Sequence, residues 1–488
     1  MDAPVRSPLK KSPAVKNKQD LRAWIAQLRA AGELQDIKGA EREREIGGIV
    51  DIYQRRVGNK AVLFDDIQGY PRGYRILANI LTSVRRINIT LGLDADESSN
   101  DLIQYWRRTM KEAHAIAPVA VPSGPVMENV LTGCDIDIFK IPVPRWHEHD
   151  GGYYIGTGDM VIMRDPDTGW INYGAYRVQA QARNTATLMC SKGKHGDLIR
   201  RRYHERGESC PIAVICGMHP ALFMIAGLEV PYGKNEFEAA GGLIGEAVEV
   251  IDGPRTGLPI PAHAEIAFEG FIHPNDVLDE GPLGEWTGYY TGGLKKEPAI
   301  RIETLMHRHD PILLGAIPGI PPDDDSFYRG TYRAGAVWNQ LEAAGVPEVK
   351  GVWAHPAGGS RVAHRRDQAA ICRSRQAGRS DRLAMSCRRL CQCFVVVVDD
   401  DIDPSDTDKV VWAMCTRFDP REGMETLRGC WSTALDPMAY AADDPRNARV
   451  VIDACKPFNR RDSFPIVVRA SKEVEDLVRR KFADLLPR

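Results

Sequence analysis

The sequence lacks any apolar run close to the roughly 18 to 20 residues that a membrane-spanning helix requires. Its opening residues, MDAPVRSPLKKSPAVKNK, contain no apolar signal core either. We therefore expect a cytoplasmic protein with no membrane partner.

Neither sign of charge is in excess, because 64 Lys and Arg residues stand against 66 Asp and Glu residues, a net charge of -2. No overall basic field attracts nucleic acid, so we expect no nucleic-acid partner. The 11 cysteines are odd in number, scattered, and without the spacing of zinc ligands. This pattern argues against structural zinc and favours reduced thiols over disulfides.

The composition is that of a folded globular protein, with 43% hydrophobic and 27% charged residues. At 488 residues the chain is too long for one compact core, which predicts two or three domains. The basic, proline-punctuated residues 1–18 predict a flexible tail before the first of them.

Helical and strand patterns alternate from residue 19 to about 115, which predicts a small N-terminal α/β domain. Asp20 is placed to cap a helix that Gly32 ends. The apolar residues of this helix recur at helical spacing: Leu21, Trp24, Ile25 and Leu28.

From about 150 to 310, short strand-like runs are broken by Gly, Pro and Asp, which predicts a β-barrel or sandwich with helical insertions. The runs MVIMR and WINYGAYR flank DPDTG and predict a hairpin. The last third is α/β again: FVVVVDDDIDP predicts an apolar strand, and SKEVEDLVRRKFADLL predicts an amphipathic terminal helix.

Residues that can carry chemistry concentrate between 172 and 290. Asn172-Tyr-Gly-Ala-Tyr-Arg177 holds an amide and a guanidinium on one strand. Lys192-Gly-Lys194-His195-Gly196 combines glycine with groups that can approach phosphate or bind a metal. Each segment alone also fits a structural role. The first fits a hairpin strand with exposed polar residues, and the second fits a solvated basic turn.

Two acidic pieces follow. Glu236 and Glu238 precede a glycine-rich stretch, where either suits a hard metal ion or caps a helix. In Glu280-Gly-Pro-Leu-Gly-Glu285-Trp-Thr-Gly-Tyr-Tyr, glycine and proline disfavour a helix, so both carboxylates lie on a shaped loop beside aromatic residues. Such surroundings can raise a carboxyl pKa toward neutrality, as a proton donor needs.

Together the four pieces resemble the UbiD-type decarboxylases, which use a prenylated flavin mononucleotide (prenylated FMN). The resemblance runs from LRAWIAQLRAAGEL through LTGCDIDIFKIPVP to FVVVVDDDIDPSDTDKVVWAMCTR. It implies a multidomain α/β protein: an N-terminal α/β domain over 19–120, a central split β-barrel that binds prenylated FMN over 121–315, and a C-terminal α/β oligomerisation domain over 316–488.

The resemblance also implies a metal site beside the cofactor. Asn172, His195 and Glu236 would hold Mn²⁺ or Mg²⁺ bridging to the cofactor phosphate, and Lys194 would lie near that phosphate. K⁺ is a further ion that the resemblance allows.

The catalytic trio that the resemblance implies is Arg177, Glu280 and Glu285. Arg177 would orient Glu280 and the substrate carboxylate, and Glu285 would donate the proton that replaces carbon dioxide. Trp286, next to Glu285, and the tyrosines that follow it suggest a flat ring near the acid, although such residues are as often core.

The implied reaction is the reversible, non-oxidative decarboxylation of an aromatic, heteroaromatic or α,β-unsaturated carboxylic acid through a covalent adduct with prenylated FMN. The implied partners are the carboxylic acid substrate, a flavin prenyltransferase that supplies the cofactor, and further copies of the chain in a homodimer or homohexamer.

Residues 361–393 depart from the family pattern, with nine Arg, no Lys and four of the 11 Cys. The stretch from Asp367 to Gly378 can be written in codons that, read one base later, encode IKQRFAGHAKQA, which resembles the family. The stretch from Cys387 to Cys393 shifts in the same direction to AGAYANA. We interpret the segment as a local frameshift, which removes a Lys that approaches the cofactor phosphate in the family.

Two alternatives to an active decarboxylase stay open. The disrupted segment suggests an inactive flavin-binding or assembly homologue, which would retain flavin without releasing carbon dioxide. Metal-dependent hydrolysis would use Asn172, His195 and Glu236 but gives no role to Glu280 and Glu285.

Replacing residues 361–393 by the frame-restored sequence should raise flavin occupancy, melting temperature and decarboxylase activity together. One charge-assisted phosphate contact contributes about 1.5–3 kcal/mol, and improved packing adds to it. The chain as written and the restored chain are compared by flavin absorbance, thermal unfolding and carbon dioxide release. Equal occupancy and melting temperature would show that the Arg-rich segment is a tolerated insertion.

Overall fold

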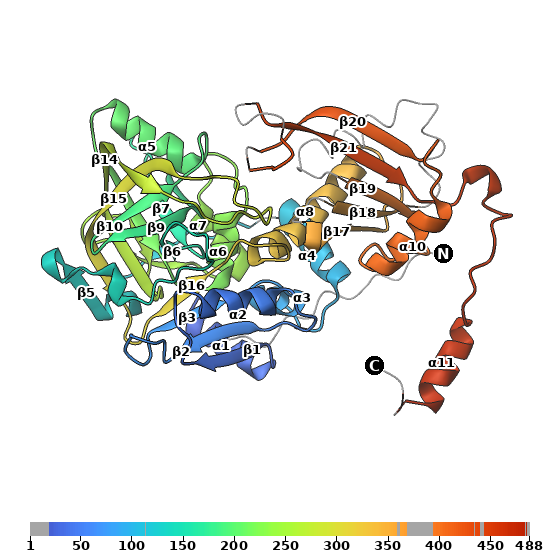
Figure 1. Cartoon of the computed structure of the whole chain (residues 1–488), viewed down its shortest axis with the longest axis horizontal. Coiled ribbons are helices and arrows are strands. Elements are labelled where there is room, and N and C mark those ends of the chain that lie inside the picture. Colours follow the sequence, from blue (N-terminus) through green and yellow to red (C-terminus); the bar gives the residue numbers. More distant parts are fainter. Residues whose placement is uncertain are drawn as a thin grey trace.

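The computed structural model describes residues 19–112, 114–358, 362–367, 394–433, 435–439, 444–483 and 485 (Figure 1). The predicted tail at 1–18 lies outside the described residues. So does the proposed frameshift, apart from the backbone of strand β18 (Val362–Asp367).

Helix α1 (Leu21–Ala30) forms as the sequence predicts. The Asp20 side chain accepts a hydrogen bond from the backbone N–H of Arg22 at 2.7 Å, and Gly32 follows the helix with a φ of +71°. The residues predicted to face the core are all buried: Leu21, Trp24, Ile25 and Leu28. Capping and apolar spacing therefore fix this element locally.

The N-terminal sheet is completed by a strand from far along the chain. Its order is β1 (Leu34–Lys38), β2 (Ala61–Asp65), β3 (Arg75–Ala78) and β16 (Ile312–Gly315). Strand β16 pairs with β3 in parallel, after the chain has passed through the whole central region. Three helices accompany this sheet in the sequence: α2 (Glu45–Gln54), α3 (Val84–Thr90) and α4 (Ser99–Lys111).

The central region is a curled nine-stranded sheet in which β6, β9, β10, β15, β14, β11, β7 and β8 lie in order and β5 pairs with β15 (Figure 1). Its strands are β5 (Asn129–Thr132), β6 (Tyr153–Gly156), β7 (Met160–Arg164), β8 (Ile171–Gly174), β9 (Arg177–Ala182), β10 (Thr185–Met189), β11 (Cys210–Ile215), β14 (Ile266–Glu280) and β15 (Lys295–His307). The predicted hairpin is confirmed, because β7 and β8 pair antiparallel. The prediction that one strand carries both Asn172 and Arg177 is wrong, because β8 ends at Gly174 and Arg177 begins β9.

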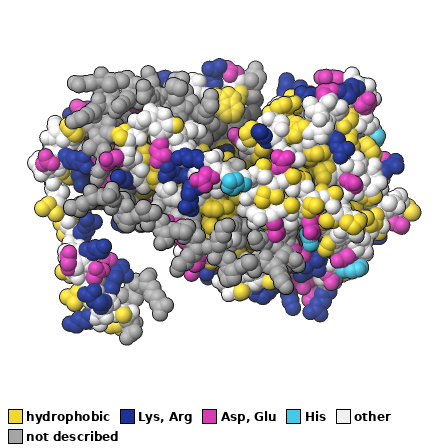
Figure 2. Space-filling view, turned by 180° about the vertical axis from the view of Figure 1, so that it is seen from behind, with side chains coloured by type: hydrophobic (Ala, Val, Ile, Leu, Met, Phe, Trp, Pro, Cys, Tyr) yellow, Lys and Arg dark blue, Asp and Glu magenta, His cyan; other side chains and the backbone are white. Residues whose placement is uncertain are grey.

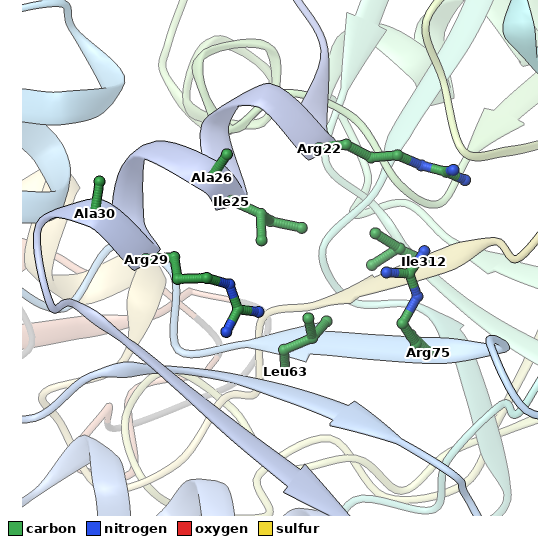
Figure 3. A pocket seen from close by; sticks show the side chains of 8 residues that line it. All are labelled: Arg22, Ile25, Ala26, Arg29, Ala30, Leu63, Arg75 and Ile312. Carbon is green, nitrogen blue, oxygen red and sulfur yellow. The ribbon is translucent and has the colours of Figure 1, made fainter.

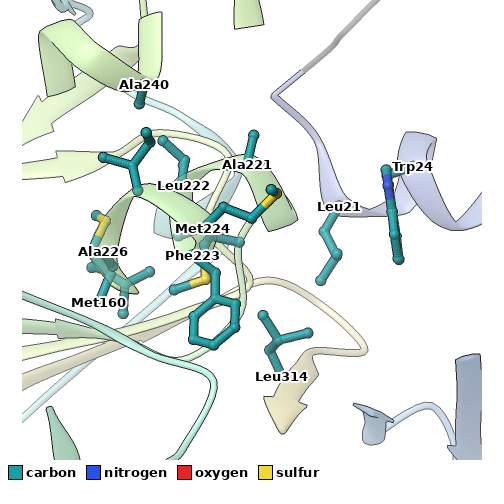
Figure 4. Packing of buried hydrophobic residues seen from close by; sticks show 14 of the residues in the cluster. Leu21, Trp24, Met160, Ala221, Leu222, Phe223, Met224, Ala226, Ala240 and Leu314 are labelled. Carbon is teal, nitrogen blue, oxygen red and sulfur yellow. The ribbon is translucent and has the colours of Figure 1, made fainter. Parts of the chain in front are cut away.

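Three helices and a small sheet are inserted among these strands. The helices are α5 (His195–Glu205), α6 (Pro220–Gly227) and α7 (Glu236–Ile244). The small sheet joins β4 (Val119–Ala120), β12 (Glu249–Asp252) and β13 (Pro259–Pro261). One apolar cluster joins α1 to α6, with Leu21 and Trp24 on one side and Phe223 and Met224 on the other (Figure 4).

The C-terminal region begins with the long helix α8 (Asp324–Ala343) and continues in a five-stranded sheet. The sheet has the order β17 (Gly351–Ala354), β18, β19 (Phe394–Asp399), β21 (Arg446–Asp453), β20 (Met424–Trp431), and helix α10 is Thr407–Arg417. The predicted terminal helix is α11 (Lys472–Lys481), which is exposed throughout and projects away from the rest of the chain (Figure 1).

The predicted multidomain α/β class is confirmed, and the curled sheet lies where the split barrel was predicted. Basic and acidic groups are interspersed over the described part of the face in Figure 2. Among the described residues, no helix is both long enough and apolar enough to cross a membrane. The boundaries at 120 and 315 stay predictions.

Helix α2 offers a matched pair of glycines. A Cβ on Gly47 would lie 1.6 Å from the carbonyl oxygen of Trp146, whereas a Cβ on Gly48 meets nothing within 4 Å. We expect Gly47→Ala to destabilise the fold by about 1–3 kcal/mol, since backbone cannot move aside cheaply. Gly48→Ala should stabilise it by about 0.5–1 kcal/mol through helix propensity. Thermal unfolding measures both, and equal shifts would contradict this packing.

Candidate active site

Three chain segments bring the predicted metal ligands together. Asn172 is the second residue of β8, and His195 and Glu236 are the first residues of α5 and α7. The side chain of Asn235 caps α7 by accepting a hydrogen bond from the backbone N–H of Phe237 at 2.9 Å. This cap fixes where the helix begins and therefore where Glu236 stands.

The three side chains converge. Asn172 Nδ2 donates to Glu236 Oε1 at 2.6 Å, and His195 Nδ1 lies 3.4 Å from Asn172 Nδ2 and 4.0 Å from Glu236 Oε1. Glu236 Oε2 accepts a hydrogen bond from the backbone N–H of Tyr173 at 3.2 Å. The Glu236 carboxylate therefore hydrogen-bonds both to the Asn172 side chain and to the backbone of the strand that carries Asn172.

The donor set suits a cation. Burial raises the pKa of Glu236 to about 7, and burial followed by Lys194 lowers the pKa of His195, so its imidazole is a neutral ligand at pH 7. Asn172 Oδ1 is buried without a hydrogen-bond partner. Turning that amide over would bring its oxygen against the Glu236 carboxylate, an arrangement that a hard cation stabilises.

Only two of the three predicted metal ligands are carboxylate or imidazole groups. Across the residues that the structure describes, no group of three or more His, Cys, Asp or Glu side chains gathers in a way that could hold a metal. The set at Asn172 contains two such side chains and an amide. Lys194 lies exposed at the N-cap of α5, beside the N–H groups that make a helix N-terminus attractive to phosphate.

The second predicted group is a tightly paired trio. Arg177 Nε and Nη2 donate to the two oxygens of Glu280 at 2.8 and 2.7 Å, and Nη1 donates to Glu285 Oε1 at 2.9 Å. Glu280 is fully buried and Glu285 is 8% exposed. Both acids predicted from the loop motif therefore face the guanidinium of Arg177, the first residue of β9.

The trio's two carboxylates differ in their surroundings. Glu280 receives the two-pronged contact, while Glu285 receives one N–H of Arg177. Burial raises the pKa of Glu285 above its ordinary value, and the opposing influence of Arg177 and Lys295 is smaller. Glu285 therefore holds its proton at higher pH than an exposed glutamate does, which is what a general acid requires.

Side chains outside the predicted set shape the loop after Glu280. Gln179 Oε1 accepts a hydrogen bond from the backbone N–H of Gly281 at 2.9 Å, and a Cβ on Gly151 would lie 1.8 Å from the Gly281 carbonyl oxygen. Gly281 itself has a φ of +90°, which glycine tolerates. Gln179 follows Arg177 by two residues on β9, so same-face spacing along a strand would have indicated it.

Two tyrosines also make hydrogen bonds that involve the loop after Glu280. Tyr154 is buried and donates to the Pro282 carbonyl at 3.1 Å, and burial followed by the charge of Glu280 raises its pKa. Tyr290 donates to Asp150 Oδ1 at 2.9 Å. No motif in the sequence marks Tyr154 or Asp150, because their partners come from a distant loop. Tyr289 is 61% exposed.

Asn172 and Arg177, one from each group, lie five residues apart on consecutive strands. At roughly 3.3–3.6 Å per residue, their Cα atoms are separated by no more than about 18 Å. The predicted metal ligand Asn172 and the trio member Arg177 are therefore near each other in the chain and in space.

The comparisons with known proteins agree in every region. Models of the 3-octaprenyl-4-hydroxybenzoate carboxy-lyase N-terminal, Rift-related and C-terminal domains match residues 25–106, 118–321 and 327–454. The chain is 30% identical to the pyrrole-2-carboxylic acid decarboxylase of Pseudomonas aeruginosa, over 90% of this chain and 91% of that protein. The chain belongs to the UbiD family of carboxy-lyases.

Other members agree with this assignment. A phenolic acid decarboxylase of Streptomyces sp. (strain D7) is 29% identical, over 90% of this chain and 92% of that protein. The UbiD-class enzyme HmfF from Pelotomaculum thermopropionicum, solved in complex with FMN, superposes with a TM-score of 0.82, at 23% identity and covering 96% of this chain and 100% of that chain. The protein is thus a UbiD-type decarboxylase by descent, and its fold is that of the class.

Proposed function

We propose that this UbiD-type decarboxylase removes carbon dioxide from an aromatic, heteroaromatic or α,β-unsaturated carboxylic acid with prenylated FMN as cofactor. The observation that carries the proposal is the trio of Arg177, Glu280 and Glu285, in which Glu280 accepts two hydrogen bonds from the guanidinium and burial raises the pKa of Glu285. The relatives support the substrate class, because two of them are named as decarboxylases of pyrrole-2-carboxylic and phenolic acids.

The cofactor assignment draws on the same neighbours. HmfF has been solved with FMN and, as an evolved dimeric form, with prFMN. When bound, the modified flavin supplies the electron sink that the departing carboxylate needs. Asn172, His195 and Glu236 would hold Mn²⁺ or Mg²⁺ at its phosphate, and the unpartnered Asn172 Oδ1 supports this role.

In this proposal Arg177 positions both acids and the substrate. Three of its five N–H groups are engaged by Glu280 and Glu285, which leaves two for a substrate carboxylate. Substrate binding would add a negative charge beside two carboxylates and so favour the protonated form of Glu285. Glu285 then gives its proton to the carbon that has lost carbon dioxide, and in the carboxylation direction it takes that proton back.

The trio also separates the proposal from its alternatives. Hydrolysis at the proposed metal ligands gives no function to Glu280, Glu285 and Arg177. Decarboxylation gives a function to all three, so it accounts for more of the residues of the site. The inactive homologue differs from the enzyme only through residues 361–393, and the frame-restored comparison decides between these two readings. Oligomer size and a flavin prenyltransferase as cofactor supplier stay predictions.

Glu236→Gln should lower metal and flavin content together, because the carboxylate ties the ligand set to strand β8. Glu238→Gln is the matched control, since it removes a carboxylate from the same helical turn without touching Asn172. Elemental analysis and flavin absorbance after coexpression with a flavin prenyltransferase measure both. Full metal and flavin content in Glu236→Gln would rule out this ligand assignment.

Glu285→Gln should reduce turnover by roughly 10²-fold or more while flavin stays bound, because the amide has no transferable proton. In the unmodified enzyme, activity should fall as pH rises through the elevated pKa of Glu285, since the proton-bearing form is lost. The control is Asp279→Asn, because Asp279 is exposed and directly precedes Glu280 in the sequence. Carbon dioxide release from a set of aromatic acids gives the rates, and unchanged turnover would remove Glu285 from the mechanism.

A further inference from the structure

Asp150 is a buried carboxylate that faces the loop carrying Glu285. It is 1% exposed and lies three residues before β6, on a segment that supplies neither the trio nor the predicted metal ligands. Burial raises the pKa of Asp150, and its hydrogen-bond donors act in the opposite direction. Because a carboxylate removed from water depends on such donors, its partners show which part of the chain it holds in place.

The partners of Asp150 lie on both sides of Glu285. The hydroxyl of Tyr290 donates to Asp150 Oδ1 at 2.9 Å, and the backbone N–H of His147 donates to Oδ2 at 2.7 Å. The backbone N–H of Gly284 also stabilises the charged form of this carboxylate. Gly284 directly precedes Glu285, and Tyr290 follows it by five residues. One carboxylate therefore acts on the loop both before and after the proposed proton donor.

The loop between these two points is closed by its own backbone. The N–H of Glu285 donates to the carbonyl oxygen of Tyr289 at 3.0 Å, and the N–H of Gly288 donates to the carbonyl oxygen of Glu285 at 2.8 Å. These hydrogen bonds join the backbone of Glu285 to the residue next to Tyr290. A displacement of Tyr290 would therefore move the backbone that carries the Glu285 side chain.

The segment that carries Asp150 is itself fixed against the protein. Arg145 Nε donates to the carbonyl oxygen of Asp150 at 3.0 Å. The backbone N–H of the next residue, Gly151, donates to the carbonyl oxygen of Pro282 at 2.7 Å. The Asp150 side chain thus extends from a backbone that is already attached to the start of the acidic loop.

We propose that Asp150 is a positioning residue, which holds Glu285 in place by anchoring Tyr290. Glu285 accepts only one hydrogen bond from Arg177, whereas Glu280 accepts two, so the position of Glu285 depends more on its own backbone. Proton transfer requires the donor within hydrogen-bond reach, and a displacement of about 1 Å can cost roughly 10²-fold in rate. The inference rests on the proposed function, in which Glu285 supplies the proton.

Tyr290→Phe and Tyr289→Phe form a matched pair, because each removes one hydroxyl and only the first removes a contact with Asp150. Tyr290→Phe should reduce turnover by about three- to tenfold, with KM and flavin content unchanged. Asp150→Asn should reduce turnover by roughly 10²-fold, since an amide offers only one acceptor oxygen to these donors. Tyr289→Phe should leave turnover unchanged. Carbon dioxide release from the aromatic acids used for Glu285→Gln gives the rates.

Backbone hydrogen exchange of the full chain without flavin measures the anchoring independently of the reaction. Exchange over residues 283–290 should be at least about fivefold faster in Tyr290→Phe and Asp150→Asn, and unchanged in Tyr289→Phe. Arg29→Gln is a remote control, because Arg29 is an exposed residue of α1 that borders the cavity beside the N-terminal sheet (Figure 3). It should change neither measurement.

Thermal unfolding establishes that each variant is folded. If Asp150→Asn does not fold, Tyr290→Phe decides by itself, because it leaves the carboxylate in place. Unchanged exchange over the loop in these variants would overturn the proposal, and so would faster exchange with undiminished turnover where Glu285→Gln loses activity. Undiminished turnover in Glu285→Gln would instead contradict the proposed proton donor, and the exchange rates would still decide whether Asp150 anchors the loop.

Discussion

The site depends on one interaction, the guanidinium of Arg177 held between two buried carboxylates. Two acids removed from water repel each other and cannot both stay ionised without a cation beside them. Arg177 neutralises Glu280 through two parallel hydrogen bonds and leaves Glu285 with one. This unequal sharing places two chemically identical residues in different surroundings, and burial raises the pKa of the less strongly paired Glu285.

The fold serves that interaction by joining distant pieces of chain. Strand β9 carries Arg177, the end of β14 carries Glu280, and the loop beyond it carries Glu285. Gln179 and the close approach of Gly151 hold the loop in place. At the proposed metal ligands Asn172, His195 and Glu236, β8 and the first turns of α5 and α7 meet in the same way. In both groups, strands and helix termini set the positions and hydrogen bonds set the orientation.

Local features of the sequence predicted local structure well. Asp20 and the apolar spacing after it defined α1, and the turn residues DPDTG defined the β7–β8 hairpin, because both depend on contacts within a few residues. The four motifs also indicated the residue types of the site, and the family resemblance joined them. Tyr154, Asp150 and the completion of the N-terminal sheet by β16 were missed, since their partners lie more than a hundred residues away.

The sequence by itself determined the chemistry that is available: which carboxylates, which guanidinium, which amide and which imidazole, and that glycine and proline shape the acidic loop. Only the tertiary structure decided how these groups pair, that Glu280 takes two N–H groups and Glu285 one, and that Asn172 Oδ1 is left without a hydrogen-bond partner. The reason is physical. Hydrogen-bond pairing and loss of hydration depend on distances between segments that the chain brings together only when it folds.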